Sequence, residues 1–437
     1  MTTHPRTEVG AGEALHVRRK TTRFGPSALI LAALLAACGG GSAGSATIAP
    51  SAPAASGAAA AQPASASSSP ATQAIASSKP AAAPTSGGAA SAAAGSDWQA
   101  TWDRTLAAAK QEGKVAVEVN PPIDVYRPLY DAFQKKYGIT VDLIAFSGSA
   151  DLVPRLKAER DAGQYNWDVI VHAPITLFAG AKPLGALDPL RPALILPEAL
   201  DDSKWFKGFE AGWYDSGKSL AYSFVGYLFF NTYVNRQVVS PAQFSKIDQL
   251  WDPQWKGKIA IQDPRVPSAG SAGTATWLAA KGEDKLRAFF RDQQPVLTQD
   301  KRQLAEWVVR GQYPIGVGLS ESQMSQFKSS GLPVDSVQAI DDGDRAAADY
   351  SSGSGAVGLF NRAPHPNAAR VLINWLLTAE AQKIYSELSG FNSRRLDVPV
   401  VSASQRADPA KDYINVENED GAATYQRAIA IGKELLK

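Results

Sequence analysis

After an N-terminal section without regular patterning, the chain alternates short apolar runs with amphipathic stretches. Three apolar runs, at residues 115–119, 139–146 and 167–171, are bounded by Gly, Pro or Asn residues and predict buried strands. Residues 125–137 and 150–163, which lie between these runs, predict helices. Apolar strands that alternate with helices are typical of a parallel, doubly wound sheet.

The same alternation returns in the second half of the chain. Residues 259–261 predict a short buried strand, and a small polar loop at residues 265–273 precedes a helix that we expect from about residue 274. A strand of small residues at 315–319 is followed by Ser320-Glu321 at a second strand-to-helix junction. Open α/β sheets bind ligands at such junctions, because helix starts offer unpaired backbone amides.

A family resemblance is carried by Leu250-Trp251-Asp252-Pro253 with Trp255-Lys256-Gly257-Lys258-Ile259-Ala260 behind it. The phrase resembles the inter-lobe segment of extracellular solute-binding proteins of ABC importers, in the branch that contains the ferric-iron-binding proteins. Similar phrases occur at residues 225–232, 363–382 and 394–398. The resemblance implies a type II periplasmic-binding fold, in which two α/β lobes, each a doubly wound and mainly parallel sheet, are joined by two hinge strands.

On this basis we expect four parts. A lipoprotein signal peptide occupies residues 1–37, and a disordered tether that begins with a lipidated cysteine occupies residues 38–96. We expect lobe 1 at residues 97–228 and 350–398, and lobe 2 at residues 229–349 and 399–437. The hinge strands are expected near residues 225–231 and 350–359.

The N-terminus predicts export. Arg18-Arg19-Lys20 and Arg23 precede an apolar run at residues 28–37, which is too short for an ordinary membrane-spanning helix. The run ends in Leu35-Ala36-Ala37-Cys38, which resembles a bacterial lipobox with lipidation of Cys38. A hydrophobic N-terminal anchor with an inert cysteine is the alternative.

The charge balance changes once the signal is removed. Residues 1–37 carry five Arg or Lys against two Glu, a net charge of +3, and the whole chain is +2, so the mature protein is near −1. Nucleic acid is therefore not an expected partner. Residues 39–96 are almost wholly Ala, Ser, Gly and Pro, which is typical of a flexible tether. We expect a monomer that its lipid holds at the cell membrane, facing the periplasm or the cell exterior.

Little in the mature sequence predicts catalysis. His172 and His365 are its two histidines, and these are too few for a zinc or redox cluster. Residues 212–219 match the Walker A spacing, but the apolar residues 220–225 behind them predict a strand where a phosphate-binding loop needs a helix. We interpret this match as a hairpin turn, and we expect no enzyme activity, no metal site and no cofactor.

Ligand binding is better supported, by polar residues at predicted strand ends and helix starts. The candidate ligand-binding residues are Asn120, Ser147, Gly148, Ser149, His172, Tyr222, Arg265, Ser268, Ser271, Ser320, Glu321 and Tyr350. Free amides and hydroxyls suit anionic or polar ligands, and an Arg can pair with a carboxylate or phosphate. For each serine, a small residue that merely permits a tight loop is the alternative.

The expected solute is small and polar or anionic, and the resemblance implies that ABC permease subunits receive it. Ferric iron is the alternative ligand. Iron-binding members of this branch usually show two adjacent tyrosines in the second lobe, whereas the stretch from Gly311 here offers only Tyr313. A secreted enzyme or a sensor that uses a similar two-lobe fold represents the alternative classes of function.

Overall fold

The computed structural model describes residues 89–437, so the expected signal peptide, Cys38 and the tether up to residue 88 lie outside the described residues. The helices are α1 Ala89–Glu112, α2 Ile123–Tyr137, α3 Ser149–Asp161, α4 Pro197–Leu200, α5 Ala269–Lys281, α6 Glu283–Ala288, α7 Lys301–Val309, α8 Glu321–Ser329, α9 Pro366–Leu376, α10 Ala379–Ser389 and α11 Glu419–Leu435. The strands are β1 Lys114–Val119, β2 Thr140–Ala145, β3 Val169–His172, β4 Leu187–Asp188, β5 Tyr222–Ser223, β6 Tyr227–Phe230, β7 Thr232–Asn235, β8 Ile259–Gln262, β9 Val296–Thr298, β10 Ile315–Val317, β11 Val337–Ala339, β12 Ala348–Ser351 and β13 Ala356–Phe360.

The first sheet is formed by the run of strands and helices that opens the described chain. Its order is β2-β1-β3-β13-β4, with β5 beside β13. β1 pairs in parallel with β2 and β3, and β13 is antiparallel to β3. The three strands predicted at residues 115–171 are confirmed. The sheet is mixed because β13, which comes much later in the chain, is antiparallel to β3. We call this sheet and its helices lobe 1.

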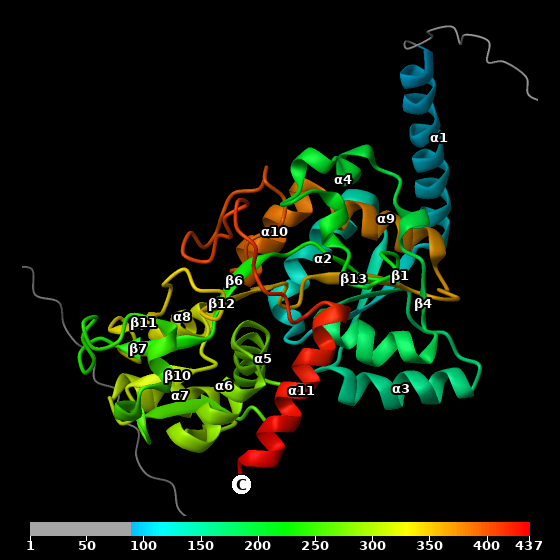
Figure 1. Ribbon diagram of the computed structural model, residues 1–437. Helices are drawn as coiled ribbons and strands as arrows, with labels where there is room; N and C mark the ends of the chain where they lie inside the picture. The colour runs from blue at the N-terminus through cyan, green and yellow to red at the C-terminus, as the bar shows by residue number, and fades with distance from the viewer. Residues whose placement is uncertain (1–88) are drawn as a thin grey trace, which may run out of the picture. The chain divides into compact units, whose positions relative to one another are not determined.

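The second sheet has the order β11-β7-β10-β8-β9 and defines lobe 2 (Figure 1). β8 pairs in parallel with β9 and β10, and β7 is antiparallel to β10 and β11. Each lobe has its own apolar core. Trp375 and Phe133 are fully buried in lobe 1, and Trp277 and Phe289 are fully buried in lobe 2.

A two-stranded ribbon joins the lobes. β6 and β12 pair antiparallel, with Phe229 opposite Asp349 and Leu228 opposite Tyr350. β6 continues through Asn231 into β7 of the second sheet, and β12 is followed by β13 of the first sheet. Because side chains alternate along a strand, one face of the ribbon carries Tyr227, Phe229, Asp349 and Ser351, and the other face carries Leu228 and Tyr350.

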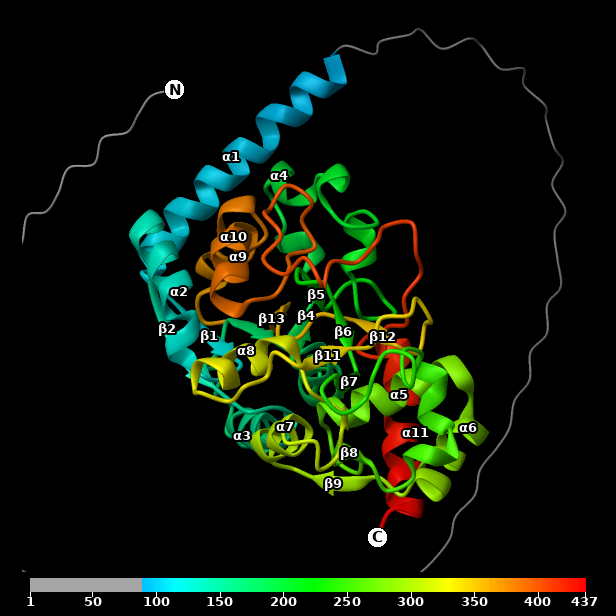
Figure 2. The ribbon, with the colours of Figure 1, turned by 90° about the vertical axis from the view of Figure 1, so that its left-hand side faces the viewer.

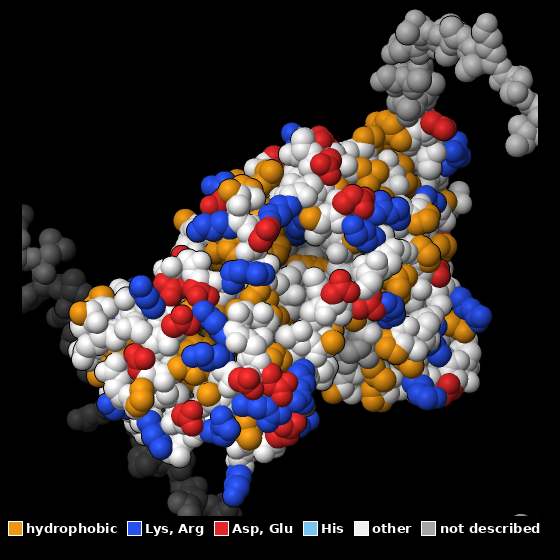
Figure 3. All heavy atoms as spheres, viewed as in Figure 1, with side chains coloured by type: hydrophobic (Ala, Val, Ile, Leu, Met, Phe, Trp, Pro, Cys, Tyr) orange, Lys and Arg blue, Asp and Glu red, His pale blue; other side chains and the backbone are white. Residues whose placement is uncertain are grey.

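The last helix, α11, lies against α5 and α6 of lobe 2, as both ribbon views show (Figures 1 and 2). Its first turn reaches lobe 1, where Glu419 forms an ion pair with Lys182 and accepts a hydrogen bond from the Ser216 amide at 2.9 Å. At its other end, Arg287 and Arg427 form ion pairs with Glu434. Basic and acidic side chains are therefore interspersed in this part of the surface (Figure 3).

Hydrogen bonds show the local structure of two segments singled out in the sequence, residues 212–219 and 265–273. The Walker A match forms a turn, as interpreted, because the Asp215 carboxylate accepts hydrogen bonds from the amides of Ser219, Leu220 and Ala221 at 2.9 to 3.1 Å. The polar loop expected at residues 265–273 is wrong in its second half, because Ser268 caps a helix that begins at Ala269. Within the described residues, no helix combines the length and apolar character needed to span a bilayer.

Candidate ligand-binding site

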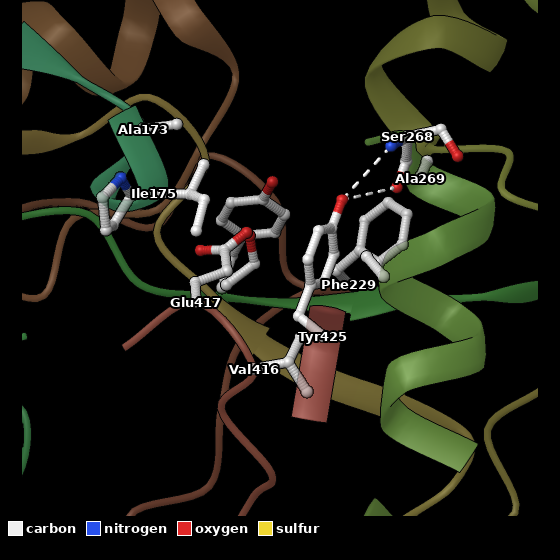
Figure 4. A pocket seen from close by; sticks show the side chains of 12 residues that line it. Ala173, Ile175, Phe229, Ser268, Ala269, Val416, Glu417 and Tyr425 are labelled. Atoms are coloured by element: carbon white, nitrogen blue, oxygen red, sulfur yellow. Dashed lines mark hydrogen bonds between the residues drawn. The ribbon is translucent and has the colours of Figure 1, made fainter. Parts of the chain in front are cut away.

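A cavity of about 210 Å³ lies where the two lobes, the ribbon and α11 meet (Figure 4). Each lobe, the ribbon and the C-terminal segment contribute to its wall. The lining residues are Ala173, Pro174, Ile175, Tyr227, Phe229, Ser268, Ala269, Ala272, Ser351, Val416, Glu417 and Tyr425. A concave site that both lobes line is suited to enclosing a small solute.

The lobe 1 wall is the segment that follows β3. His172 ends this strand with 2% of its side chain exposed and supports the wall from behind. Its Nδ1 accepts a hydrogen bond from the Ala173 amide at 2.8 Å, and its Nε2 lies 3.0 Å from the Phe146 carbonyl oxygen. This pairing fits a neutral ring with the proton on Nε2, and burial correspondingly lowers the pKa of His172.

The lobe 2 wall is the first turn of α5, where the amides of Ser268, Ala269 and Ser271 have partners within the chain. The Ser268 hydroxyl accepts from the Ser271 amide at 3.0 Å, and the Ser271 hydroxyl accepts from the Ser268 amide at 2.8 Å. The Ala269 amide donates to Gln262 Oε1 at 3.1 Å. Gly270 allows this turn to sit on β8, because a Cβ there would lie 1.8 Å from the Gln262 carbonyl oxygen.

Tyr425 brings α11 to the same wall. Its hydroxyl accepts a hydrogen bond from the Ser268 amide at 3.2 Å and lies 2.8 Å from Ser271 Oγ. Figure 4 shows the hydroxyl pointing toward Ser268 at the start of α5. Burial raises the pKa of Tyr425, so its phenol stays protonated at neutral pH.

Glu417 is the charged side chain of the cavity wall, and the ribbon orients it. Its Oε1 accepts from Ser351 Oγ at 2.7 Å, and its Oε2 accepts from the amide and the hydroxyl of Ser352 at 2.7 and 2.8 Å. Burial raises the pKa of Glu417 above its ordinary value, and the hydrogen bonds from both serines oppose that rise.

A second carboxyl lies in the ribbon itself. Asp349 is fully buried, its Oδ1 lies 3.3 Å from the Thr276 hydroxyl, and its Oδ2 has no hydrogen-bond partner among the residues that the structure describes. Burial, followed by the nearby charge of Glu417, raises the pKa of Asp349 well above its ordinary value. Among the described residues, no group of three or more His, Cys, Asp or Glu side chains could hold a metal ion.

The sequence of residues 128–417 matches the profile of the bacterial extracellular solute-binding proteins. The chain belongs to this family. It is accordingly a solute-binding protein of an ABC import system, and its cavity lies between two lobes that the ribbon connects.

Individual relatives of this solute-binding protein are distant. An uncharacterized protein of Haemophilus influenzae is 24% identical over 340 residues, which are 75% of this chain and 91% of the relative. The Trichodesmium protein IdiA (FutA), solved in complex with iron and citrate ligands, is 22% identical with a TM-score of 0.58, and apo FutA2 of Synechocystis PCC6803 is 20% identical with a TM-score of 0.57. Each covers 74% of this chain and 99% of its own. The type II fold expected from the sequence is confirmed.

The candidate residues of the solute-binding protein fall into three groups. Ser268 lines the cavity, and Ser271 lies behind it in the same turn and contacts Tyr425. His172 supports the opposite wall. These three are the candidates that the structure brings to one place.

A second group follows strands of lobe 1 or begins α8, away from the cavity wall. Asn120 borders a separate small hollow with Tyr126 and Tyr385. The start of α3 is formed by Ser147, Gly148 and Ser149, the last of which is the first residue of the helix. Ser149 packs close to Gly180, because a Cβ atom added to that glycine would lie 3.3 Å from Ser149 Oγ. Ser320 caps α8, and Glu321 Oε2 accepts a hydrogen bond from Ser404 Oγ at 2.7 Å.

The third group serves packing or pairing. Tyr222 is fully buried in lobe 1 and stacks on Phe209 with ring centroids 4.5 Å apart. Tyr350 projects from the other face of the ribbon and stacks on Phe206 at 5.2 Å. Arg265 forms a two-pronged ion pair with Asp263, with contacts of 2.9 and 3.0 Å.

Most of the lining residues lack a local sequence signal. Val416, Glu417 and Tyr425 belong to a C-terminal segment that reaches the cavity only through the packing of α11 on α5. Tyr227 and Phe229 lie in a continuous apolar run, in which strand parity alone separates cavity-facing side chains from core side chains. The alternation along β6 was the one available signal for these two residues.

Proposed function

We propose that this protein is the substrate-binding lipoprotein of its import system and captures one small polar organic solute in the cavity between its lobes. The observation that carries the proposal is the composition of the cavity wall. Ile175 of lobe 1, Ala269 of lobe 2, Phe229 of the ribbon and Tyr425 of α11 all border one space of about 210 Å³. A solute in this space contacts both lobes at once.

Capture follows from that geometry. A ligand that touches both lobes binds the closed arrangement better than an open one, so it shifts the population toward closure. The ribbon is the connection that must flex, because β6 and β12 are the strands that pass between the sheets. The permease then receives the solute from the closed form. We propose lobe boundaries at residues 97–228 with 350–398 for lobe 1 and 229–349 with 399–437 for lobe 2. Two observations support them: β13 lies in the first sheet, and α11 packs on α5 of lobe 2.

Export and anchoring belong to the same proposal. The basic flank, the short apolar run and Cys38 in a lipobox support a lipid-anchored receptor on the outer side of the cell membrane, and we propose that this receptor is a monomer. We propose no catalytic step, because residues 128–417 match a family of solute-binding proteins.

Ferric iron is the second candidate solute, because solved proteins of similar fold include one in complex with iron and citrate ligands. The cavity offers the phenols of Tyr227 and Tyr425 and the carboxylate of Glu417. Burial raises the pKa of both phenols, which opposes the phenolate form that a hard trivalent cation requires. An organic solute therefore fits the cavity better.

A thermal-shift screen of the full chain tests the proposal, with ferric citrate, sugars, carboxylates, phosphonates and organic amines as probes. A ligand at a hundred times its dissociation constant stabilises the folded state by about 2.7 kcal/mol, which raises the melting temperature measurably. We expect a shift with one organic class and no product after prolonged incubation. A ferric shift with a visible charge-transfer band would establish the second candidate, and turnover of any probe would refute a receptor.

A further inference from the structure

The lining of the cavity includes an acidic side chain but no basic one. Of its twelve lining residues, Glu417 is the only Asp or Glu, and none is a Lys, Arg or His. The remaining members are alanine, proline, isoleucine, valine, serine, phenylalanine and tyrosine. An anionic solute would therefore meet a carboxylate with no cation in the lining to offset it.

The Glu417 carboxylate also has capacity left for a ligand. It accepts three hydrogen bonds, from the Ser351 hydroxyl and from the amide and hydroxyl of Ser352. All three donors are neutral, and a carboxylate offers about four acceptor positions. Among residues 89–437, its hydrogen-bond donors are thus neutral, and no cation is among them to balance its negative charge.

Asp349 is a second carboxyl group in this region, and burial favours its neutral form. It lies on the same face of the ribbon as Phe229 and Ser351, is fully buried, and has one oxygen without a partner. Its other oxygen faces the neutral hydroxyl of Thr276 at 3.3 Å. Neither carboxyl group has a lysine or arginine among its hydrogen-bond partners in residues 89–437.

The apolar part of the wall suits a cation as well. The rings of Tyr227, Phe229 and Tyr425 border the cavity, and aromatic faces attract ammonium and guanidinium groups. The start of α5, by contrast, offers little to an anion, because the amides of Ser268, Ala269 and Ser271 are hydrogen-bonded within the chain.

We propose that the solute carries a positively charged group, an ammonium or a guanidinium, which pairs with Glu417 while the apolar body of the solute lies against Phe229 and Ile175. This inference rests on the proposed function, since it names the class of solute that the same cavity takes. Among small polar solutes, the inference therefore favours those with a positive charge, which is opposite to the charge of Glu417.

The experiment compares probes of one shape and different charge on the full chain by isothermal titration calorimetry at constant ionic strength. Butylammonium, 1-butanol and butyrate form one series, and tetramethylammonium with tert-butanol forms a second. Guanidinium chloride is used at concentrations below those that unfold the protein. We expect a cation to bind at least tenfold more tightly than its neutral analogue, and butyrate to bind no more tightly than 1-butanol.

Variants assign the effect to Glu417. We expect Glu417→Gln to weaken binding of the preferred cation at least tenfold and to leave the affinity for the matched neutral probe within about twofold. Glu387→Gln is the control, because it removes an equal charge from an exposed position on α10, outside the cavity lining. A purely structural Glu417 would change the affinities for the cation and the neutral probe alike. If Glu417→Gln does not fold, the comparison of cationic, neutral and anionic probes on the unmodified protein still tests whether the solute is a cation.

The contrary outcomes are distinct. Equal or tighter binding of butyrate, or of the neutral analogues, overturns the cationic assignment, as does failure of every cation to bind. If a sugar or a carboxylate binds in the wider screen, the receptor function stands and the cationic assignment falls. If a probe is converted to product, the receptor function itself falls.

Discussion

The hydroxyl of Tyr425 lies 2.8 Å from Ser271 Oγ, so the last helix is tied to the first turn of α5 at the cavity wall. The same hydroxyl accepts a hydrogen bond from the Ser268 amide at 3.2 Å. A single phenol thereby connects α11 with the residue that caps α5. The position of the lobe 2 wall consequently depends on a segment more than 150 residues further along the chain.

We expect Tyr425→Phe to lower the free energy of unfolding by about 1 kcal/mol, because a mostly buried hydroxyl loses its partners. Urea unfolding measures this change. Tyr413→Phe is the matched control, since the Tyr413 hydroxyl accepts a single hydrogen bond, from the Asp408 amide, at an exposed site. Equal losses in the two variants would contradict a special role for the contact between α11 and α5.

The ion pair between Lys182 and Glu419 links lobe 1 to the start of α11, whose body packs on lobe 2. Both side chains are partly exposed, so we expect Glu419→Gln to change global stability by less than about 1 kcal/mol. We expect it to loosen the link between the lobes, which small-angle X-ray scattering of the ligand-free protein would show as a larger radius of gyration.

Glu434→Gln tests whether this effect is specific. The substitution is on the same helix, but Glu434 pairs with Arg287 and Arg427 and does not reach lobe 1. We expect it to leave the scattering profile unchanged. A larger radius of gyration in both variants would point to fraying of α11 instead of a lost link between lobes.

The fold could be predicted from the sequence because its strands in lobe 1 are short, continuous apolar runs with clear ends. Residues 115–119, 139–146 and 167–171 correspond to β1, β2 and β3. β1 and β3 are almost wholly buried, whereas β2 lies at the edge of the sheet and is partly exposed. The antiparallel strands β7 and β13 could not be predicted in this way. Their direction follows from the crossing of the ribbon, which is a long-range property.

The cavity was less predictable, and Ser268 shows why. Ser268 lines the cavity, yet the amides around it are used by Ser271, Gln262 and Tyr425. Local sequence indicates where donors lie but not whether other parts of the chain have already paired them. Glu417 was missed for the converse reason, because its partners Ser351 and Ser352 are 65 residues or more away.

Glu118 makes the stability of lobe 1 depend on pH between about 4.5 and 8. The side chain is fully buried in β1, and within residues 89–437 neither carboxyl oxygen has a hydrogen-bond partner of ordinary geometry. Burial raises its pKa from 4.5 to about 8, although the nearby Phe146 backbone opposes the rise. Between these values the folded state holds a proton that the unfolded chain has released. The free energy of unfolding therefore falls as the pH rises through this range, by a few kcal/mol in order of magnitude.

We expect Glu118→Gln to flatten this dependence. Urea unfolding should give similar stabilities for the two proteins near pH 5 and a more stable variant near pH 9, because the amide has no proton to lose. Parallel pH profiles for the variant and the unmodified protein would show that another group controls the loss of stability over this pH range.

Gly270 sets the distance between α5 and β8, and its replacement tests how closely the cavity wall depends on that distance. A Cβ there would lie 1.8 Å from the Gln262 carbonyl oxygen, and this atom belongs to the backbone of a buried strand, so it cannot rotate away. We expect Gly270→Ala to displace the first turn of α5, to lower the melting temperature by several degrees and to weaken solute binding. Gly180→Ala is the control, because its new methyl group would lie no closer than 3.3 Å to a side chain. If Gly270→Ala kept both its melting temperature and its affinity, the start of α5 would be far more adjustable than the close contact with β8 implies.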